Sequence, residues 1–517
     1  MKKKLKGDER VTLSNYVTIA QTSGTQVEFD DATYERVAAN RGTLLELTKN
    51  RVVYGVNTGM GGFVDWLIPE HQLKPLQENL IKGVATNVGE PLSDSETRGA
   101  MLARIISLSR GNSAVSEENF RKLISIFNAG IIPYIPQKGS LGASGDLGPL
   151  ACIALVGTGA WKAKYNGTFM PGAEALKKAG INPMVLDSKE GLAFVNGTSA
   201  MVSLASLLIE RTERFVEFYE LVSALTLETL RAKRKPFDPR VHALKPHKGQ
   251  QTTAKHIFEL LADSKLIEDE DIKSASLFHE KEDNPHAGTS SVEDAYSLRC
   301  TPQIIGPIRD TLIYIRQIAE NELNSSNDNP LVITEEREVF HNGHFHGQYL
   351  AMAMDQLAVC LTTLSNLSDR RIDRFLDEHN SNGLPPFLSA NPGIQFGLMG
   401  GQFMTASLTA ENRSLCVPLS IQTLPSTGDF QDIVSLGLVA ARRVKTIFEN
   451  LKYITAFELM CAVQAAEFRG ANKLGSQTSE LYKSIRKIVP SYTKDRVMTD
   501  DLEQLAQYIE SSRLQMP

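Results

Sequence analysis

The sequence is poor in cysteine and contains none of the usual cysteine motifs. Its five cysteines, at positions 152, 300, 360, 416 and 461, are scattered over 517 residues and never form Cys-x-x-Cys. A sparse, odd set of this kind excludes a disulfide framework and a zinc-ribbon site, and it indicates a reducing compartment.

The sequence also has no long apolar run and no strong charge of either sign. No stretch approaches the roughly 18 uninterrupted apolar residues of a membrane span, and the segment VTLSNYVTIAQTSGT after the N-terminal lysines is too polar for a signal-peptide core. The net charge is −5, so no basic field recruits nucleic acid. The phosphate-loop pattern GxxxxGK[ST] is absent. We therefore expect a soluble cytoplasmic protein with no nucleic-acid, nucleotide or membrane partner.

What the chain has in quantity is helical periodicity. Apolar residues recur at steps of three and four over 204–225, 350–364 and 444–457, and Pro236 and Pro239 prevent continuation of the first stripe. The segment after Ser93 begins with capping residues. Strand-like alternation is confined to short segments near 164–170 and 339–347. These patterns predict an all-α fold in two parts: an irregular N-terminal part, 1–200, and a long central helix bundle with C-terminal helices, 201–517.

The most informative local feature is the triplet Ala143-Ser144-Gly145 within GSLGASGDLGPLA. Gly145 has no Cβ, so its backbone nitrogen can approach the carbonyl carbon of Ala143. Ring closure with loss of two waters, one from the Ser144 hydroxyl, would give a methylidene-imidazolone, which is an electrophile made from backbone. The competing interpretation is an ordinary glycine-rich turn.

Several other motifs accompany the triplet in a fixed order. They are YGVNTGMGGF at 54–63, FVNGTSA at 194–200, AYSLRCTPQIIG at 295–306, ELNSSNDNP at 322–330 and FHNGHFHGQ at 340–348. Together with the triplet, the set resembles the aromatic amino acid ammonia-lyase and aminomutase family, over nearly the whole chain after about residue 25. The segments LQENLIKGVATNVG and LARIISLSRGNSA resemble the bacterial phenylalanine 2,3-aminomutases of that family, which supply (S)-β-phenylalanine to antibiotic synthesis.

The resemblance implies a fold, an assembly and a cofactor. It implies the histidase/L-aspartase type of helical fold in a homotetramer, with active sites shared between subunits. It also implies 4-methylidene-imidazol-5-one, formed autocatalytically from Ala143-Ser144-Gly145, with no metal and no nucleotide. His341, His344 and His346 form an HxxHxH pattern, but no nearby carboxylate pattern completes a metal site.

The resemblance assigns catalytic roles to three further residues besides the triplet. Tyr54 matches the base that removes the β-proton. A phenol is a poor base at neutral pH unless its phenolate is favoured locally, and we expect helix N-termini to do this. Tyr296 matches a second site tyrosine, and Asn196 matches the asparagine beside the prosthetic group, although a buried structural amide is an equal alternative for Asn196.

The resemblance also assigns residues that bind the substrate. Arg299 matches the carboxylate clamp, a role that suits its planar fork. Gln303 and Asn329 match polar lining positions, for which a structural role is an equal alternative, and Phe345 matches an aromatic packed beside the ring.

The aromatic pocket is expected to be apolar and to suit phenylalanine. Val84 stands where relatives acting on tyrosine or histidine tend to carry histidine, and it cannot pair a para-hydroxyl. Phe430, with Leu192 or Met60, is expected beside it. Gln431 stands where histidine ammonia-lyases and plant phenylalanine ammonia-lyases carry glutamate. The change argues against histidine as substrate, because a carboxylate there would engage an imidazole.

The resemblance therefore implies an aminomutase that converts L-α-phenylalanine to β-phenylalanine by elimination and re-addition of ammonia through a methylidene-imidazolone adduct, with cinnamate as by-product. Three alternatives stay open: a phenylalanine or tyrosine ammonia-lyase, a tyrosine 2,3-aminomutase, and a non-catalytic helical scaffold. The choice between mutase and lyase depends on how long the arylacrylate is retained, which no single residue reveals.

Overall fold

The computed structural model describes residues 2–281, 286 and 290–511, and in these ranges the chain folds into two units. The first unit comprises Met1–Glu210, Ile315–Asp355 and Pro418–Val444. The second comprises the described residues of Arg211–Tyr314, Gln356–Val417 and Lys445–Pro517. The boundary predicted between residues 200 and 201 follows chain order, whereas the first unit also includes two later segments.

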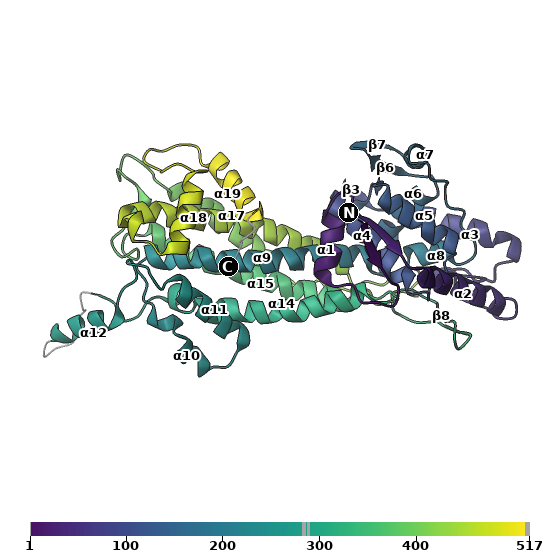
Figure 1. The fold of residues 1–517 in the computed structure, drawn as a ribbon, viewed down its shortest axis with the longest axis horizontal. Helices are drawn as coiled ribbons and strands as arrows, with labels where there is room; N and C mark the ends of the chain where they lie inside the picture. Colours follow the sequence, from purple (N-terminus) through teal and green to yellow (C-terminus); the bar gives the residue numbers. More distant parts are fainter. Residues whose placement is uncertain (1, 282–285, 287–289, 512–517) are drawn as a thin grey trace. The chain divides into compact units, whose positions relative to one another are not determined.

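The first unit is helical with four small sheets (Figure 1). Its helices are α1 (Leu13–Gln21), α2 (Asp31–Leu47), α3 (Leu73–Gly83), α4 (Asp94–Ser109), α5 (Glu117–Asn128), α6 (Leu147–Gly157), α7 (Gly172–Lys178) and α8 (Glu190–Val195). Its strands are β1 (Lys2–Leu5), β2 (Gln26–Phe29), β3 (Val88–Pro91), β4 (Ile132–Pro133), β5 (Pro136–Lys138), β6 (Lys162–Tyr165), β7 (Thr168–Pro171), β8 (Leu331–Ile333) and β9 (Glu338–Phe340). β1 and β2 pair in parallel, whereas β3–β5, β4–β6–β7 and β8–β9 are antiparallel.

Helix α4 begins where the sequence predicts. The Ser93 hydroxyl accepts a hydrogen bond from the Glu96 N–H, and the Glu96 carboxylate accepts one from the Ser93 N–H. This reciprocal capping box satisfies two backbone donors that the first turn leaves unpaired. Nearly every residue of α4 is buried, so this helix forms the centre of the first unit.

Four long helices contribute residues to both units: α9 (Ser199–Thr229), α14 (Thr301–Leu323), α15 (Gln348–Leu376) and α17 (Gly437–Arg469). Three of them, α9, α15 and α17, cover the three apolar stripes found in the sequence, so those predictions are confirmed. α14 continues through Pro307. α15 is long and apolar enough for a membrane span by length and composition, but 67% of its most apolar window is buried, which is typical of a core helix.

The second unit is a helix bundle around the C-terminal half of α9, and its remaining helices are α10 (Pro239–Ala243), α11 (Lys248–Leu260), α12 (Glu270–His279), α13 (Tyr296–Arg299), α16 (Met399–Ser414), α18 (Ser476–Arg486) and α19 (Thr499–Ser511). α9 contacts three helices of the bundle. The buried Glu220 carboxylate accepts two hydrogen bonds from Arg309 of α14, the Tyr219 hydroxyl donates to Leu364 O of α15, and Phe215 packs against Phe448 of α17. Figure 1 shows α9, α14 and α15 running side by side. The predicted all-α fold is confirmed.

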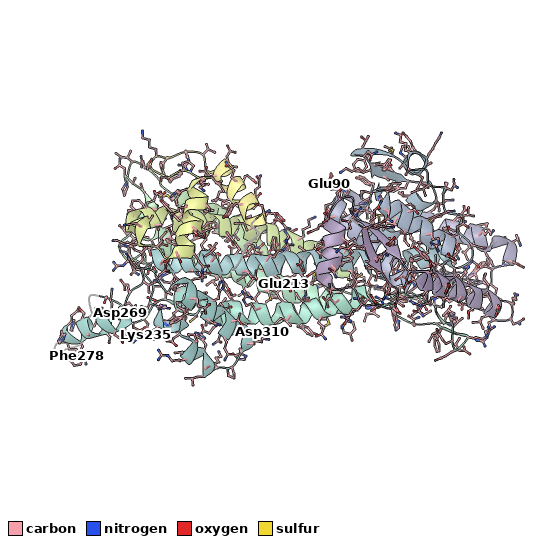
Figure 2. The ribbon with its side chains drawn as sticks, viewed as in Figure 1. Glu90, Glu213, Lys235, Asp269, Phe278 and Asp310 are labelled. Atoms are coloured by element: carbon pink, nitrogen blue, oxygen red, sulfur yellow. The ribbon has the colours of Figure 1, made fainter. Side chains whose placement is uncertain are left out.

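Helix α12 lies at the surface of the second unit. The Asp269 carboxylate caps α12 by accepting hydrogen bonds from the N–H groups of Asp271 and Ile272. Figure 2 shows Asp269 and Phe278 at opposite ends of this helix.

Candidate active site

A cavity of about 710 Å³ lies within the first unit. Its walls come from the loop around Tyr54, from α3, from the start of α6, from the end of α8 and from two segments near residues 341–346 and 427–433. Segments far apart in the sequence therefore meet at one concave site, as expected for a small-molecule pocket.

The loop that carries Tyr54 is fixed on both sides of that residue. Val53 and Val56 are buried in an apolar cluster with Leu44 of α2, Ala114 and Val332 of β8. The intervening Tyr54 side chain consequently points away from this cluster and lines the cavity.

Two contacts position the Tyr54 phenol. Its oxygen accepts a hydrogen bond from the Gly61 N–H at 3.0 Å, and its ring stacks on Phe430, with 6.4 Å between ring centroids and 21° between planes. Burial raises the pKa of Tyr54 above its ordinary value, and the Gly61 hydrogen bond offsets only part of that rise. Among the described residues the expected local preference for the phenolate is therefore not found, because desolvation outweighs the single donor.

The triplet loop is folded tightly against the segment between α8 and α9. Gly145 has φ +71°, and a Cβ built on it would lie 2.1 Å from Gly197 O. The Asp146 N–H donates to Gly197 O at 2.7 Å, and the Gly197 N–H donates to Ser144 O at 3.3 Å. Only glycine fits at position 145, because any side chain would collide with backbone.

The two ends of the triplet loop are also held. Leu141 O accepts from the Leu436 N–H, and Gly142 O accepts from the Ser435 hydroxyl. The Asp146 carboxylate is fully buried and accepts from the Met201 N–H at 2.7 Å and from the Ser140 hydroxyl at 3.0 Å. Burial raises the pKa of Asp146 to about 7.

This geometry suits ring closure by the triplet. Ala143 and Gly145 form an isolated backbone bridge with each other, so the two residues that would be joined already face one another. The Ser144 hydroxyl lies at the cavity, where it accepts a hydrogen bond from the Gln431 amide at 2.9 Å. The residues present therefore fit a prosthetic group formed from Ala143-Ser144-Gly145.

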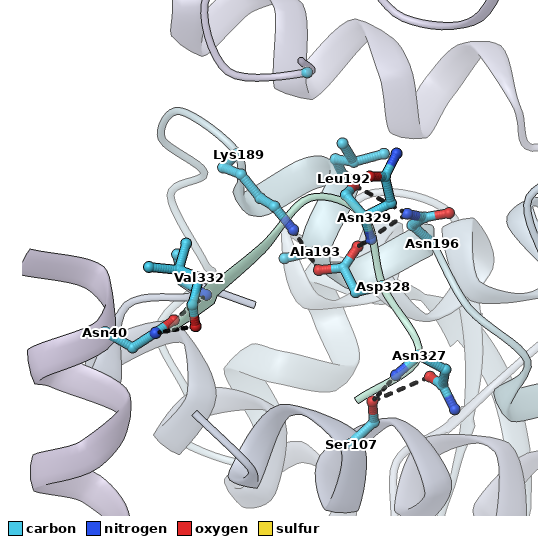
Figure 3. A network of polar contacts seen from close by, with 12 residues as sticks. Asn40, Ser107, Lys189, Leu192, Ala193, Asn196, Asn327, Asp328, Asn329 and Val332 are labelled. Atoms are coloured by element: carbon cyan, nitrogen blue, oxygen red, sulfur yellow. Dashed lines mark hydrogen bonds and ion pairs between the residues drawn. The ribbon is translucent and has the colours of Figure 1, made fainter. Parts of the chain in front are cut away.

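Asn196 is oriented by a buried network, drawn in Figure 3. Its Nδ2 donates to the Asp328 carboxylate at 2.9 Å and to Asn329 O at 3.1 Å. The Lys189 ammonium forms an ion pair with the same carboxylate, and both side chains are fully buried. With both amide hydrogens engaged, Asn196 Oδ1 is left as a buried acceptor that has no hydrogen-bond partner within the described chain.

One wall of the cavity is apolar. Leu80 and Val84 come from α3 and its C-terminal end, Leu147 begins α6, and Leu192 lies in α8. These three helices pack against one another. Phe345 and Phe430 add aromatic rings to the lining, and Met60 also lies there. An unsubstituted aromatic ring is a natural occupant of such a wall.

Comparison with known proteins identifies the family. The family model for aromatic amino acid lyase matches residues 11–487. The chain belongs to the aromatic amino acid lyase family. The structure is similar to phenylalanine aminomutase from Pantoea agglomerans, with 53% sequence identity, a TM-score of 0.96 and coverage of 98% of this chain and 99% of that one.

Other members of the aromatic amino acid lyase family carry different names. A tyrosine ammonia-lyase from Cupriavidus metallidurans is 43% identical, over 93% of this chain and 90% of its own length. A histidine ammonia-lyase from Natranaerobius thermophilus is 40% identical, over 95% of this chain and 94% of its own length.

Most of the residues that family resemblance singles out lie together. Among them, the cavity lining contains Tyr54, Val84, Ala143, Ser144, Asn196, Asn329, Phe345, Phe430 and Gln431, with Gly145 directly adjacent. Tyr296, Arg299 and Gln303 do not line it, and they belong to the second unit.

The three outlying residues form a local group of their own. Tyr296 and Arg299 share the single turn of α13, and the Arg299 guanidinium lies 5.0 Å from the Tyr296 ring centroid. Arg299 pairs with Glu293 at 2.5 Å. Arg299 Nε and Gln303 Oε1 are buried and have no hydrogen-bond partner within the described chain. One further donor and one further acceptor are therefore available in this group.

The structure adds site residues that the sequence did not single out for this role. His341 Nε2 accepts a hydrogen bond from the Tyr54 N–H at 3.2 Å, and both His341 and His346 line the cavity. Their position in FHNGHFHGQ, the motif that also contains Phe345, was the available signal. Among the described residues no group of three or more His, Cys, Asp or Glu side chains is arranged to hold a metal ion.

Proposed function

We propose that this chain is a phenylalanine 2,3-aminomutase that converts L-α-phenylalanine to β-phenylalanine and releases some cinnamate. The supporting observation is the wall formed by Leu80, Val84, Leu147 and Leu192, whose side chains offer no hydrogen-bond donor or acceptor. The 53% identity to Pantoea agglomerans phenylalanine aminomutase supports the mutase assignment.

In this proposal Tyr54 is the base that accepts the β-proton. Its phenol oxygen is held by the Gly61 N–H, and Phe430 stacks on its ring, so the proton acceptor has a fixed position in the cavity. A base must lie within hydrogen-bond reach of its proton before its pKa matters. The same phenol, once protonated, can deliver the proton to the α-carbon when ammonia adds at the β-carbon.

The prosthetic group proposed here is 4-methylidene-imidazol-5-one made from Ala143-Ser144-Gly145, and it would supply an electrophilic carbon that accepts the substrate amine. Gln431 and Asn196 are placed to adjoin it, since Gln431 bonds Ser144 and Asn196 lines the same cavity. Asn196 Oδ1, which has no partner within the described chain, can accept a hydrogen bond from the amine.

Substrate choice follows from the apolar wall. A buried hydroxyl without a partner costs about 1–3 kcal/mol, so L-tyrosine should be disfavoured against L-phenylalanine by roughly 5- to 150-fold in kcat/KM. Gln431 carries no charge to engage an imidazole, which argues against histidine although several relatives are histidine ammonia-lyases.

We further propose a cytoplasmic homotetramer in which Tyr296, Arg299 and Gln303 of another subunit complete each cavity. Exposed apolar side chains on α14, α15 and α16 support an assembly: Ile313, Tyr314, Tyr349, Met352, Val359 and Phe403. Arg299 would then bind the substrate carboxylate. Free cysteines at all five positions support a reducing compartment.

The subunit arrangement is testable by complementation. Tyr54→Phe and Arg299→Lys tetramers should each have low activity, and unfolding and refolding them together should restore part of it. Each variant refolded alone is the control. Mixed tetramers that stay as inactive as their parents contradict the shared site.

Product analysis tests the function itself. Purified protein is incubated separately with L-phenylalanine, L-tyrosine and L-histidine, and the β-amino acid and arylacrylate are measured over time. Mainly β-phenylalanine is the expected result. Arylacrylate alone would assign a lyase, the activity for which several relatives are named. No product from any substrate would favour the alternative of a non-catalytic helical scaffold.

A further inference from the structure

The backbone around Tyr54 is held by polar contacts on both sides. The Tyr54 N–H donates to His341 Nε2, which lies in an exposed position, and the Gly55 N–H donates to the Thr58 hydroxyl at 3.0 Å. On the C-terminal side, Gly55 O accepts a hydrogen bond from the side-chain amide of Gln77 at 3.1 Å. Gln77 lies in α3, does not line the cavity and is completely buried.

The other end of the Gln77 amide reaches helix α8. Gln77 Oε1 accepts a hydrogen bond from the Leu192 N–H in α8 at 3.0 Å. Leu192 belongs to the apolar wall, and α8 ends directly before Asn196. The Gln77 side chain thus joins the loop that carries Tyr54 to helix α8, which ends directly before Asn196.

Two glycines allow this arrangement. A Cβ on Gly55, which has φ +67°, would lie 2.4 Å from Leu192 Cδ2, and a Cβ on Gly191 would lie 2.6 Å from Gln77 O. Both glycines therefore bring their backbones to van der Waals contact with the Gln77–Leu192 pair. The loop and α8 approach so closely that the amide hydrogen-bonds directly to both.

The chemistry of the bridge requires glutamine. Gly55 O can only accept and the Leu192 N–H can only donate, so the partner must present one donor and one acceptor at this spacing. Glutamate retains the acceptor but loses the donor, asparagine is too short to span both groups, and leucine offers neither.

We infer that Gln77 is a positioning residue that fixes the Tyr54 phenol relative to the wall formed by Leu192 and the adjoining Asn196. The inference deepens the proposed function and rests on it for the role of Tyr54. Gln77 touches no substrate and acts only through the two backbone groups it joins.

The competing explanation is that Gln77 merely stabilises the core, as many buried amides do. The two explanations differ in what a variant changes. Loss of a core contact lowers stability and leaves the folded enzyme active, whereas loss of positioning lowers turnover of the folded enzyme, because a misplacement of about 1 Å can cost about 100-fold in rate.

The experiment uses Gln77→Leu and Gln77→Asn in the full-length protein, with Gln250→Leu as the matched control. Gln250 is a buried amide in α11 of the second unit that pairs with His242, so its loss disturbs a core without touching the Tyr54 loop. Kinetic constants for L-phenylalanine are measured per folded, chromophore-containing subunit. We expect kcat to fall about 10- to 100-fold in both Gln77 variants, with a smaller change in KM, and to stay at the wild-type value in Gln250→Leu.

A double-mutant cycle tests whether Gln77 affects kcat through Tyr54. If Gln77 acts through Tyr54, adding Gln77→Leu to Tyr54→Phe should lower kcat little further, since the positioned phenol is already absent. Equal losses in the presence and absence of the Tyr54 hydroxyl overturn the inference.

A readout without turnover separates this inference from the proposed function. The pH at which Tyr54 ionises is obtained by absorbance titration, as the difference between a protein and its Tyr54→Phe counterpart. Because burial raises the pKa of Tyr54, Gln77→Leu should lower that pKa toward the solvent value near 10, and Gln250→Leu should not. An unchanged Tyr54 titration in Gln77→Leu refutes the positioning role even if the chain does not act on phenylalanine, whereas a shifted titration without turnover on any substrate refutes only the proposed function.

Discussion

Gly145→Ala should prevent formation of the prosthetic group, and the size of its effect can be worked out from the structure. Two costs add at this position. The backbone has φ +71°, where a residue with a Cβ costs about 1–2 kcal/mol. The added Cβ would also lie 2.1 Å from Gly197 O, more than 1 Å inside the 3.4–4 Å range of ordinary van der Waals contact.

That second cost decides the outcome. A backbone carbonyl cannot rotate away like a flexible side chain, so the loop 142–146 must move off the segment at Gly197. The movement would break the hydrogen bond from the Asp146 N–H to Gly197 O and would separate the residues that face each other for ring closure. We expect no near-UV chromophore and no ammonia or β-amino acid from L-phenylalanine.

Gly167→Ala is the matched control for this variant. Gly167 lies between β6 and β7 with φ +81°, and a Cβ on it would meet nothing within 4 Å. The Gly167→Ala substitution therefore carries only the conformational cost of about 1–2 kcal/mol. It should lower Tm slightly and leave the chromophore and the activity intact. The reasoning is refuted if Gly145→Ala retains the full chromophore, or if the two variants lose the chromophore equally.

Three further predictions concern substrate choice and pH. Val84→His should raise kcat/KM for L-tyrosine relative to L-phenylalanine, because the imidazole can pair the para-hydroxyl; an unchanged ratio of the two kcat/KM values would contradict the assigned pocket. Since Tyr54 must lose a proton to act as a base and its pKa is raised by burial, kcat/KM should rise by about tenfold per pH unit on the acidic side of that pKa, and the rise should vanish in Tyr54→Phe. Burial raises the pKa of Asp146 to about 7, above its unfolded value near 3.9. The stability that the buried, protonated carboxyl contributes is therefore fully present below pH 4 and is lost as pH rises to 7. The Tm of Asp146→Asn minus that of wild type should increase over this interval, and a constant difference would contradict the prediction.

The sequence predicted the helices well because their signals are local. The capping residues after Ser93 and the apolar stripes in 204–225, 350–364 and 444–457 depend on neighbours within a few turns. The short β6–β7 pair was likewise visible as alternation near 164–170. α14 was not anticipated as one continuous helix, since Pro307 lies inside it.

The site was predictable only as far as motifs identify its members. Tyr54, the triplet and Gln431 could be named from family resemblance, but the bridge made by Gln77 joins two backbone groups and leaves no pattern in the sequence. His341 was identified only as part of HxxHxH, whereas in the structure it accepts a hydrogen bond from the Tyr54 N–H. The rise in the pKa of Tyr54 depends on burial, which a list of residues does not contain.

The hydrogen bond between Leu141 O and the Leu436 N–H bears on when the triplet loop can reach its final conformation during synthesis. The triplet is synthesised early, whereas Leu436 and Ser435, which hold the first residues of its loop, come from the last fifth of the chain. On the proposed chemistry, a nascent polypeptide would keep an ordinary serine at position 144 until residues 435–436 have emerged and bonded to the loop. The electrophile proposed here would then be made late, after the segment at 435–436 has folded against the triplet loop.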